Sequence, residues 1–231
     1  MKVGEIIQRI QSLYSKGVQS DSSRLTNRHI YNKFLTIRTK LLSEKAKKKQ
    51  KISDWNYQAI PCIELIEVEE HECPCIPIKG CKVKRSKYKI PKVMSDYNNN
   101  LIDYVMVINN QDRFDPTNRV EMLYVDGNKY TAGKKRYILE NGYIYTYGKN
   151  LPSLIKMRAL FEDPLEAISF SSYCDEEKPC PFDIFEMEFP MDADQIDVMI
   201  ELSVQEIIGI FSQGVEDLTN DNTDTQRVQP K

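Results

Sequence analysis

The stretch RYILENGYIYTY, residues 136–147, carries the clearest structural signal in this chain. Isoleucines and tyrosines alternate on both sides of Asn141-Gly142, a pair that supplies the two positive-φ residues of a type I′ turn. The stretch therefore predicts a tight β-hairpin, in which Tyr143, Tyr145 and Tyr147 share one face. Such a face can be core, an interface or a stacking platform, and core is the default interpretation.

Other segments around this hairpin also have the composition of short strands. They are rich in β-branched and aromatic residues, and they cover residues 60–68, 104–108, 120–125 and 154–161. Residues 69–100 look irregular, because they contain prolines at positions 74, 77 and 91. The whole region predicts an antiparallel, β-rich module over residues 56–170.

Helical periodicity is found at the two ends of the chain. Residues 2–16 and 22–50 predict two N-terminal helices, of which the first ends at Gly17 and the second is capped by Asp21 or Ser22. Residues 192–213 predict a C-terminal helix, capped by Asp192 or Asp194. Its broad apolar face contains Ile196, Met199, Ile200, Val204, Ile207, Ile208 and Phe211.

This layout predicts an α+β fold in which the N- and C-terminal helices pack as a helical bundle with an inserted β-rich module. The expected parts are the N-terminal helices at 1–55, the module at 56–170, a loop with the C-terminal helix at 171–214, and a flexible tail at 215–231. The tail is polar and has too few apolar residues to order itself without a partner.

Composition narrows the possible functions. The chain has 231 residues, of which 41% are hydrophobic and 29% charged, and its net charge of −2 argues against a strongly basic nucleic-acid binder. It lacks an apolar run of about 18 residues, so we expect no membrane span. Glu5, Gln8 and Arg9 interrupt any signal-peptide core, so we expect a product made in the cytoplasm.

Charge is unevenly distributed along the chain. One acid, Glu44, accompanies a set of basic residues on the second helix: Arg24, Arg28, Lys33, Arg38, Lys40, Lys45, Lys47, Lys48, Lys49 and Lys51. These residues can form a solvated helix face, or a surface for nucleic acid or an acidic partner.

A second charge contrast lies in the predicted module. Its acidic patch is Glu64, Glu67, Glu69, Glu70 and Glu72, and its basic patch covers residues 79–89. The two patches can support head-to-tail contact between identical subunits, or they can neutralise each other within one chain.

The cysteines and histidines form no persuasive site. Cys62, Cys73, Cys75 and Cys81 lie near His71 and could supply zinc ligands, but the C-x-C spacing differs from the usual C-x2-C pair. Unliganded cysteines are favoured, Cys174 and Cys180 included, and a small zinc protein is the minor alternative. The phosphate-binding, dinucleotide-binding and serine-nucleophile motifs are missing, and His29 and His71 are not spaced as a metal pair. We therefore predict no enzyme, no cofactor, and no catalytic or metal-binding residues.

Three stretches carry a family resemblance: residues 20–42, 154–167 and 180–208, the last reading CPFDIFEMEFPMDADQIDVMIELSVQEII. They resemble the head-to-tail connector (ring or adaptor) proteins of short-tailed, crAss-like bacteriophages. The resemblance implies a structural virion protein at the head–tail junction, in a homo-oligomeric ring of about twelve copies beneath the portal protein. Such a ring extends the DNA channel without sequence specificity and docks the tail or neighbouring ring proteins. The alternative hypothesis is a nucleic-acid-binding module that uses the basic helix 24–51.

Overall fold

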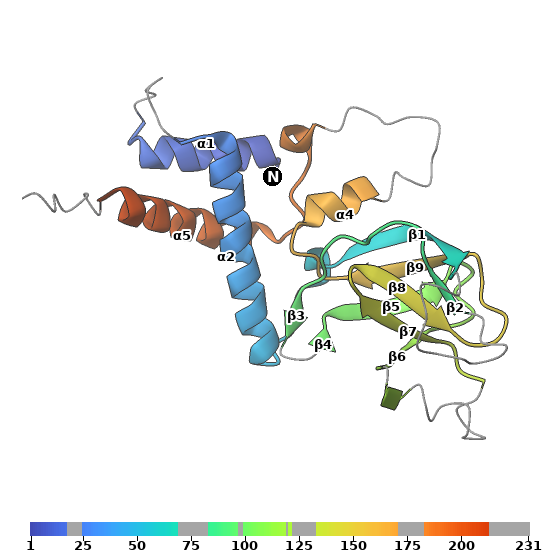
Figure 1. The fold of residues 1–231 in the computed structure, drawn as a ribbon. Coiled ribbons are helices and arrows are strands. Elements are labelled where there is room, and N and C mark those ends of the chain that lie inside the picture. Colours follow the sequence, from blue (N-terminus) through green and yellow to red (C-terminus); the bar gives the residue numbers. More distant parts are fainter. Residues whose placement is uncertain are drawn as a thin grey trace, which may run out of the picture.

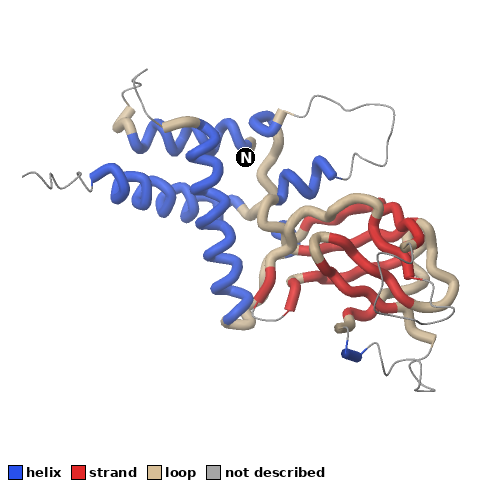
Figure 2. Tube along the Cα trace, viewed as in Figure 1, coloured by secondary structure: helices blue, strands red, loops and turns tan. Residues whose placement is uncertain are grey.

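The computed structural model describes residues 1–17, 25–68, 83–96, 99–118, 120–121, 133–170 and 183–212. The fold is of the mixed α+β kind, with helices and strands on separate sides of the molecule (Figure 2). The helices are α1 (Val3–Tyr14), α2 (Asn27–Lys47), α4 (Pro164–Phe170) and α5 (Ala193–Ser212), with 3-10 turns η1 (Asp54–Asn56) and η4 (Ile184–Glu186). The strands are β1 (Gln58–Glu67), β2 (Val83–Ser86), β3 (Ser95–Asp96), β4 (Asn99–Asn100), β5 (Ile102–Val107), β6 (Asp115–Pro116), β7 (Arg136–Glu140), β8 (Tyr143–Tyr147) and β9 (Leu154–Ala159).

Among the described residues, seven strands form one curled sheet in the order β5-β9-β1-β2-β8-β7-β6 (Figure 1). Neighbouring strands are antiparallel except β6 and β7, which are parallel. A bridge between Met106 and Arg113 and a hydrogen bond from the Phe114 N–H to the Val105 carbonyl tie β5 to the chain entering β6. The sheet is therefore nearly closed around its apolar core.

The predicted hairpin is confirmed. β7 and β8 pair up to Glu140 and Tyr143, and the turn residues Asn141 and Gly142 have φ values of 52° and 82°. The interpretation of the tyrosine face as core is wrong. Ile144 and Thr146 point inward and are buried, so Tyr143, Tyr145 and Tyr147 lie on the opposite, partly exposed face.

The other strand predictions agree with the structure in three of four places. The expected strands at 60–68, 104–108 and 154–161 correspond to β1, β5 and β9. The prediction of a strand at 120–125 is wrong for its first two residues, because Val120 and Glu121 are helical and the Glu121 N–H donates to the Asn118 side chain. Residues 122–125 lie outside the described ones. β2 falls in the region expected to be irregular, where its four residues were too few to show alternation.

The helix predictions at both ends are confirmed in place, with one shifted start. α2 begins at Asn27 rather than residue 22, because the Thr26 side chain accepts a hydrogen bond from the His29 N–H and caps it; Asp21 and Ser22 lie outside the described residues. α5 begins directly after Asp192, one of its two expected caps. Gly17 closes α1 with a φ of 82° and donates its N–H to the Ser12 carbonyl.

The long helices share one apolar core, but the structure does not confirm the expected bundle. α1 and α5 lie side by side, whereas α2 crosses them (Figure 1). The core contains residues from all three: Val3, Ile6, Ile7 and Ile10 of α1, Ile30, Phe34 and Ile37 of α2, and Ile196, Met199, Ile200 and Ile207 of α5.

α4 connects the two parts of the molecule. It follows β9, and Asp163 caps it by accepting the N–H of Leu165 at 2.9 Å. Leu165 packs into the helical core, whereas Ala167 packs into the core of the sheet. This helix was not predicted from the sequence, although Asp163-Pro164 is a common pair at helix N-termini. Because α4 contributes to both cores, the domain boundaries at 55 and 170 remain predictions.

Candidate functional site

The basic residues of α2 divide into buried and exposed groups, which the sequence could not separate. Arg38 is buried: its Nη1 donates to the Phe161 carbonyl at 2.7 Å, and its Nη2 donates to the Asn56 carbonyl at 3.3 Å. Burial lowers its pKa to about 10, so the side chain stays charged at neutral pH. Arg38 is thus a structural link between α2, η1 and the end of β9, and it is unavailable to nucleic acid.

Two neighbours of Arg38 on α2 also make internal contacts. The Tyr31 hydroxyl donates to Asp163 at 2.9 Å, and burial, followed by the charge of Asp163, raises the pKa of Tyr31. Lys33 pairs with Glu206 of α5 at 3.3 Å. These contacts fix α2 against α4 and α5, so Tyr31, Lys33 and Arg38 have structural roles, whereas Arg28 is exposed.

Besides the exposed Arg28 and Lys40, a group of exposed lysines lies at the C-terminal end of α2 and directly after it. We define the lysine corner as Lys47, Lys48, Lys49 and Lys51 together with Trp55 of η1, whose side chain is 72% exposed. Lysines at a helix C-terminus interact favourably with the negative end of the helix dipole. This corner combines positive charge with the most exposed large apolar side chain among the described residues.

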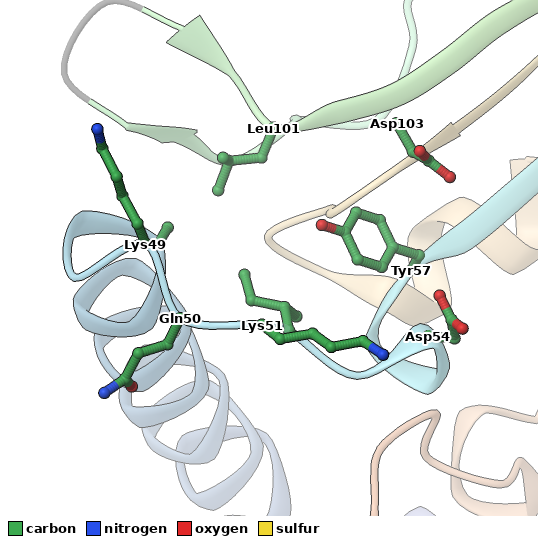
Figure 3. A pocket seen from close by; sticks show the side chains of 9 residues that line it. Lys49, Gln50, Lys51, Asp54, Tyr57, Leu101 and Asp103 are labelled. Atoms are coloured by element: carbon green, nitrogen blue, oxygen red, sulfur yellow. The ribbon is translucent and has the colours of Figure 1, made fainter.

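A cavity of about 400 Å³ opens beside the lysine corner (Figure 3). Its polar lining includes Asp54 and Asp103, and Arg158 lies 3.2 Å from each. The guanidinium also lies over the Tyr57 ring, 5.2 Å from the centroid. Arg158 offsets one of these two negative charges, and the four lysines of the corner outnumber the one that remains, so the corner keeps a net positive charge. The rest of the lining is Ala46, Lys49, Gln50, Lys51, Ile52 and Leu101.

α5 presents a second surface, on the side away from the helical core. We define the outer face of α5 as Asp194, Val198, Glu201, Gln205 and Ile208, which follow one another at spacings of three and four and are all exposed. Val198 is 51% exposed and Ile208 46%. The expectation that Ile208 belongs to the apolar core face is therefore wrong. Residues 183–212 contain acidic residues and no lysine or arginine.

The acidic and basic patches expected on the module contact each other within the chain where the structure describes them. Lys87 pairs with Glu64 at 2.7 Å, and Lys84 lies opposite Glu67 in the β1–β2 register. Glu69, Glu70, Glu72 and residues 79–82 lie outside the described part. Neutralisation within one chain is therefore the correct interpretation for Glu64 and Lys87, whereas the Lys84 ammonium donates to the carbonyls of Leu151 and Pro152.

The candidate zinc ligands fall largely outside the described residues. Cys62 is described and half-buried, whereas Cys73, Cys75, Cys81 and His71 are not, nor are Cys174 and Cys180. In the described part, no three His, Cys, Asp or Glu side chains gather as a metal site. None of the helices described there has the length and apolar character needed to cross a bilayer.

Comparison with known proteins identifies the family. Residues 5–226 match the family model described as phage tail ring protein 2. The chain is also 31% identical over 207 residues to Ring protein 2 of Bacteroides phage crAss001, covering 83% of this chain and 84% of that protein. The resemblance to crAss-like phage ring proteins is thereby confirmed, and with it a structural role in the virion. The chain belongs to the phage tail ring protein 2 family.

Proposed function

We propose that this chain is a subunit of a ring at the head–tail junction, where it binds the portal, extends the DNA channel and docks the tail. Family membership supports a ring protein of the tail. The observation that carries the proposal further is the outer face of α5, which exposes Val198 and Ile208 on a helix whose other side is already packed. A helix that is apolar on both sides is suited to contact with another protein.

Exposed apolar side chains and unbalanced charge on the helical part support a role in assembly. The lysine corner and the outer face of α5 are unlike each other, and a closed ring of identical subunits needs two different, complementary surfaces on each copy. A portal or tail protein can then bind at one end of the completed ring. The tail at 215–231 is proposed to contact the portal or the next ring.

The mass of the assembled protein tests this function. Purified protein is measured by native mass spectrometry and light scattering, alone and mixed with the cognate portal. We expect a ring of about twelve copies that binds the portal. Protein that stays monomeric in both conditions contradicts the proposal. Deletion of 215–231 is expected to weaken portal binding while leaving the circular dichroism spectrum unchanged, and undiminished binding by the truncated protein contradicts the role given to the tail.

Nucleic-acid binding is the second candidate, and the lysine corner is the observation that favours it. Its exposed lysines would bind duplex DNA without sequence specificity, and the affinity would fall steeply with salt. In a plot of the logarithm of the binding constant against the logarithm of the salt concentration, the slope changes by roughly −1 for each phosphate neutralised. Fluorescence anisotropy on a random duplex measures this slope for the wild type and for a variant with Lys47, Lys48, Lys49 and Lys51 changed to Gln. Equal binding by both proteins, or none at low salt, excludes this candidate.

A further inference from the structure

The outer face of α5 has a regular composition that a solvent-facing stripe does not need. Acid, aliphatic, acid, amide and aliphatic side chains follow one another as Asp194, Val198, Glu201, Gln205 and Ile208. The opposite stripe, with Ile196, Ile200, Ser203 and Ile207, is buried against the helical core. Aliphatic residues on both sides indicate that a second protein surface covers the outer one.

The chain's own lysine corner cannot cover this face. α5 packs on α2 through its buried stripe, and Lys33 of α2 pairs with Glu206 on that side. The outer face therefore points away from α2, and the lysines at the end of α2 cannot reach it within one copy. The roughly half-exposed Val198 and Ile208 agree with this geometry.

The two surfaces complement each other in charge and in apolar content. The outer face of α5 combines Asp194 and Glu201 with two exposed aliphatic side chains. The lysine corner combines four lysines with exposed Trp55. The adjacent cavity of about 400 Å³ is partly lined by the apolar residues Ala46, Ile52 and Leu101. Its volume far exceeds the roughly 30 Å³ share of one water in the liquid, so it can admit an aliphatic side chain.

We infer that the outer face of α5 in one copy binds the lysine corner of the next copy. The contact is heterologous, because each copy offers a different surface to each neighbour, and repeating it around an axis closes a ring. This interface rests on the proposed ring function and specifies which residues form it. Electrostatic attraction selects the partner surface, while Trp55, Val198 and Ile208 supply apolar area.

Charge reversal tests the pairing. The first variant carries K48E, K49E and K51E, so its corner becomes acidic. The second carries D194K and E201K, so its outer face becomes basic. Each is examined by native mass spectrometry with the cognate portal present, under conditions in which the wild type forms rings. Either variant alone brings two surfaces of like charge together, so we expect the ring fraction to fall at least tenfold.

Mixing the two variants is the decisive measurement. The acidic corner of the first then meets the basic face of the second, while the native corner of the second meets the native face of the first. We expect rings that contain both variants in equal numbers. Wild-type-like rings from either variant alone, or a mixture that stays monomeric, overturn the interface.

Two controls separate this interface from folding and from the ring function itself. A variant with K16E, K40E and K149E changes the net charge as much as the corner variant, at exposed positions elsewhere, and is expected to assemble normally. Circular dichroism and thermal melts verify that every variant is folded. If the wild type forms rings and the charge-reversal variants form them equally well, the proposed function stands and only this interface is contradicted. If the wild type never forms rings, both the function and the interface are contradicted.

Discussion

The sheet and the long helices differ in how their charged and exposed apolar side chains are distributed. On the sheet, Lys87 pairs with Glu64 and Lys135 with Asp112, and Arg158 bridges two aspartates. On the helical part, the outer face of α5 leaves aliphatic groups exposed, and the end of α2 concentrates lysines. Both regions make ion pairs within the chain, but the helical part also keeps an aliphatic and acidic helix face and a lysine-rich corner that another protein can use.

This difference shows where to look for function in a structural ring protein. Exposed apolar residues are ordinary when they are single, and they carry information when they align along one element beside charges of one sign. The outer face of α5 meets that condition. Exposed Leu154 on β9 does not, because it is a single apolar residue whose same-face neighbours along the strand are Lys156 and Arg158.

The largest expected effects are losses of stability on substitution of buried residues in the cores of the sheet and of the helices. Ile155→Ala in the sheet core and Ile200→Ala in the helical core are each expected to lower the free energy of unfolding by about 2–5 kcal/mol, because each leaves a cavity among fully buried neighbours. Urea unfolding followed by circular dichroism measures this loss. Val198→Ala, on the other side of α5, is the matched control and is expected to change it by about 0.5 kcal/mol or less. A loss for Val198→Ala equal to that for Ile200→Ala would contradict the assignment of an open outer face.

The next effect concerns the link between the two regions. Arg38→Met is expected to cost about 2–3 kcal/mol, because the Phe161 carbonyl is left without its buried donor. Arg38→Lys retains a positive charge but loses the fork that reaches both carbonyls, so we expect an intermediate loss. The same urea titration measures both. A stable Arg38→Met variant would show that packing, rather than these hydrogen bonds, joins helices to sheet.

A pair of identical substitutions sharpens the comparison further. Gly142→Ala is expected to destabilise the protein by about 1–2 kcal/mol, because a φ of 82° in the hairpin turn disfavours an L side chain. Gly209→Ala, in the last turns of α5 with open space around a new Cβ, is expected to stabilise it by about 0.5–1 kcal/mol. Thermal melts compare the two variants. Shifts of the same sign would refute the backbone argument for at least one of them.

The smallest effect is a pH-dependent one at the start of α1. Lys2 donates to Glu186 at 2.8 Å, which lowers the pKa of Glu186 and raises that of Lys2. The stabilisation from Glu186 is present above its unfolded pKa of 4.5 and is lost as pH falls through its lower pKa in the folded protein. The stabilisation from Lys2 is present below its unfolded pKa of 10.5 and is lost as pH rises through its higher pKa in the folded protein. Glu186→Gln should therefore be slightly less stable than the wild type between these limits and equal to it at acid pH. Melts at low and high salt measure this difference, which salt should reduce because both groups are exposed. A difference that persists at pH 2 would contradict the ion pair as its cause.

The sequence predicted the elements whose signals are local. The Asn141-Gly142 turn and the apolar periodicity of α1 and α5 depend on residues close together in the chain, so the hairpin and the terminal helices were found. The Thr26 cap was missed because a cluster of equally good cap residues precedes it at 20–23. β2 was missed because four residues cannot show a reliable alternation.

The candidate surfaces depended on tertiary contacts that the sequence does not display. Arg38 is one cation among many on α2, and only the position of the Phe161 and Asn56 carbonyls makes it structural. Ile208 follows the buried Ile207 directly, and the orientation of α5 on the core decides which of the two is exposed. Of the predicted charge contrast on the module, the Glu64–Lys87 pair is made within the chain, whereas the end of α2 gathers exposed lysines.

The pairing of the first and last long helices has a consequence during synthesis on the ribosome. Arg9 of α1 bonds to Asp197 of α5 across 188 residues, and the N–H of Val3 donates to the carbonyl of Met187 just before α5. Helices α1 and α2 thus remain without their main packing partner until nearly all described residues have emerged. The sheet can form earlier, since its strands lie between them. A truncated translation product would contain a finished sheet but lack α5, and with it the helix proposed to join neighbouring subunits.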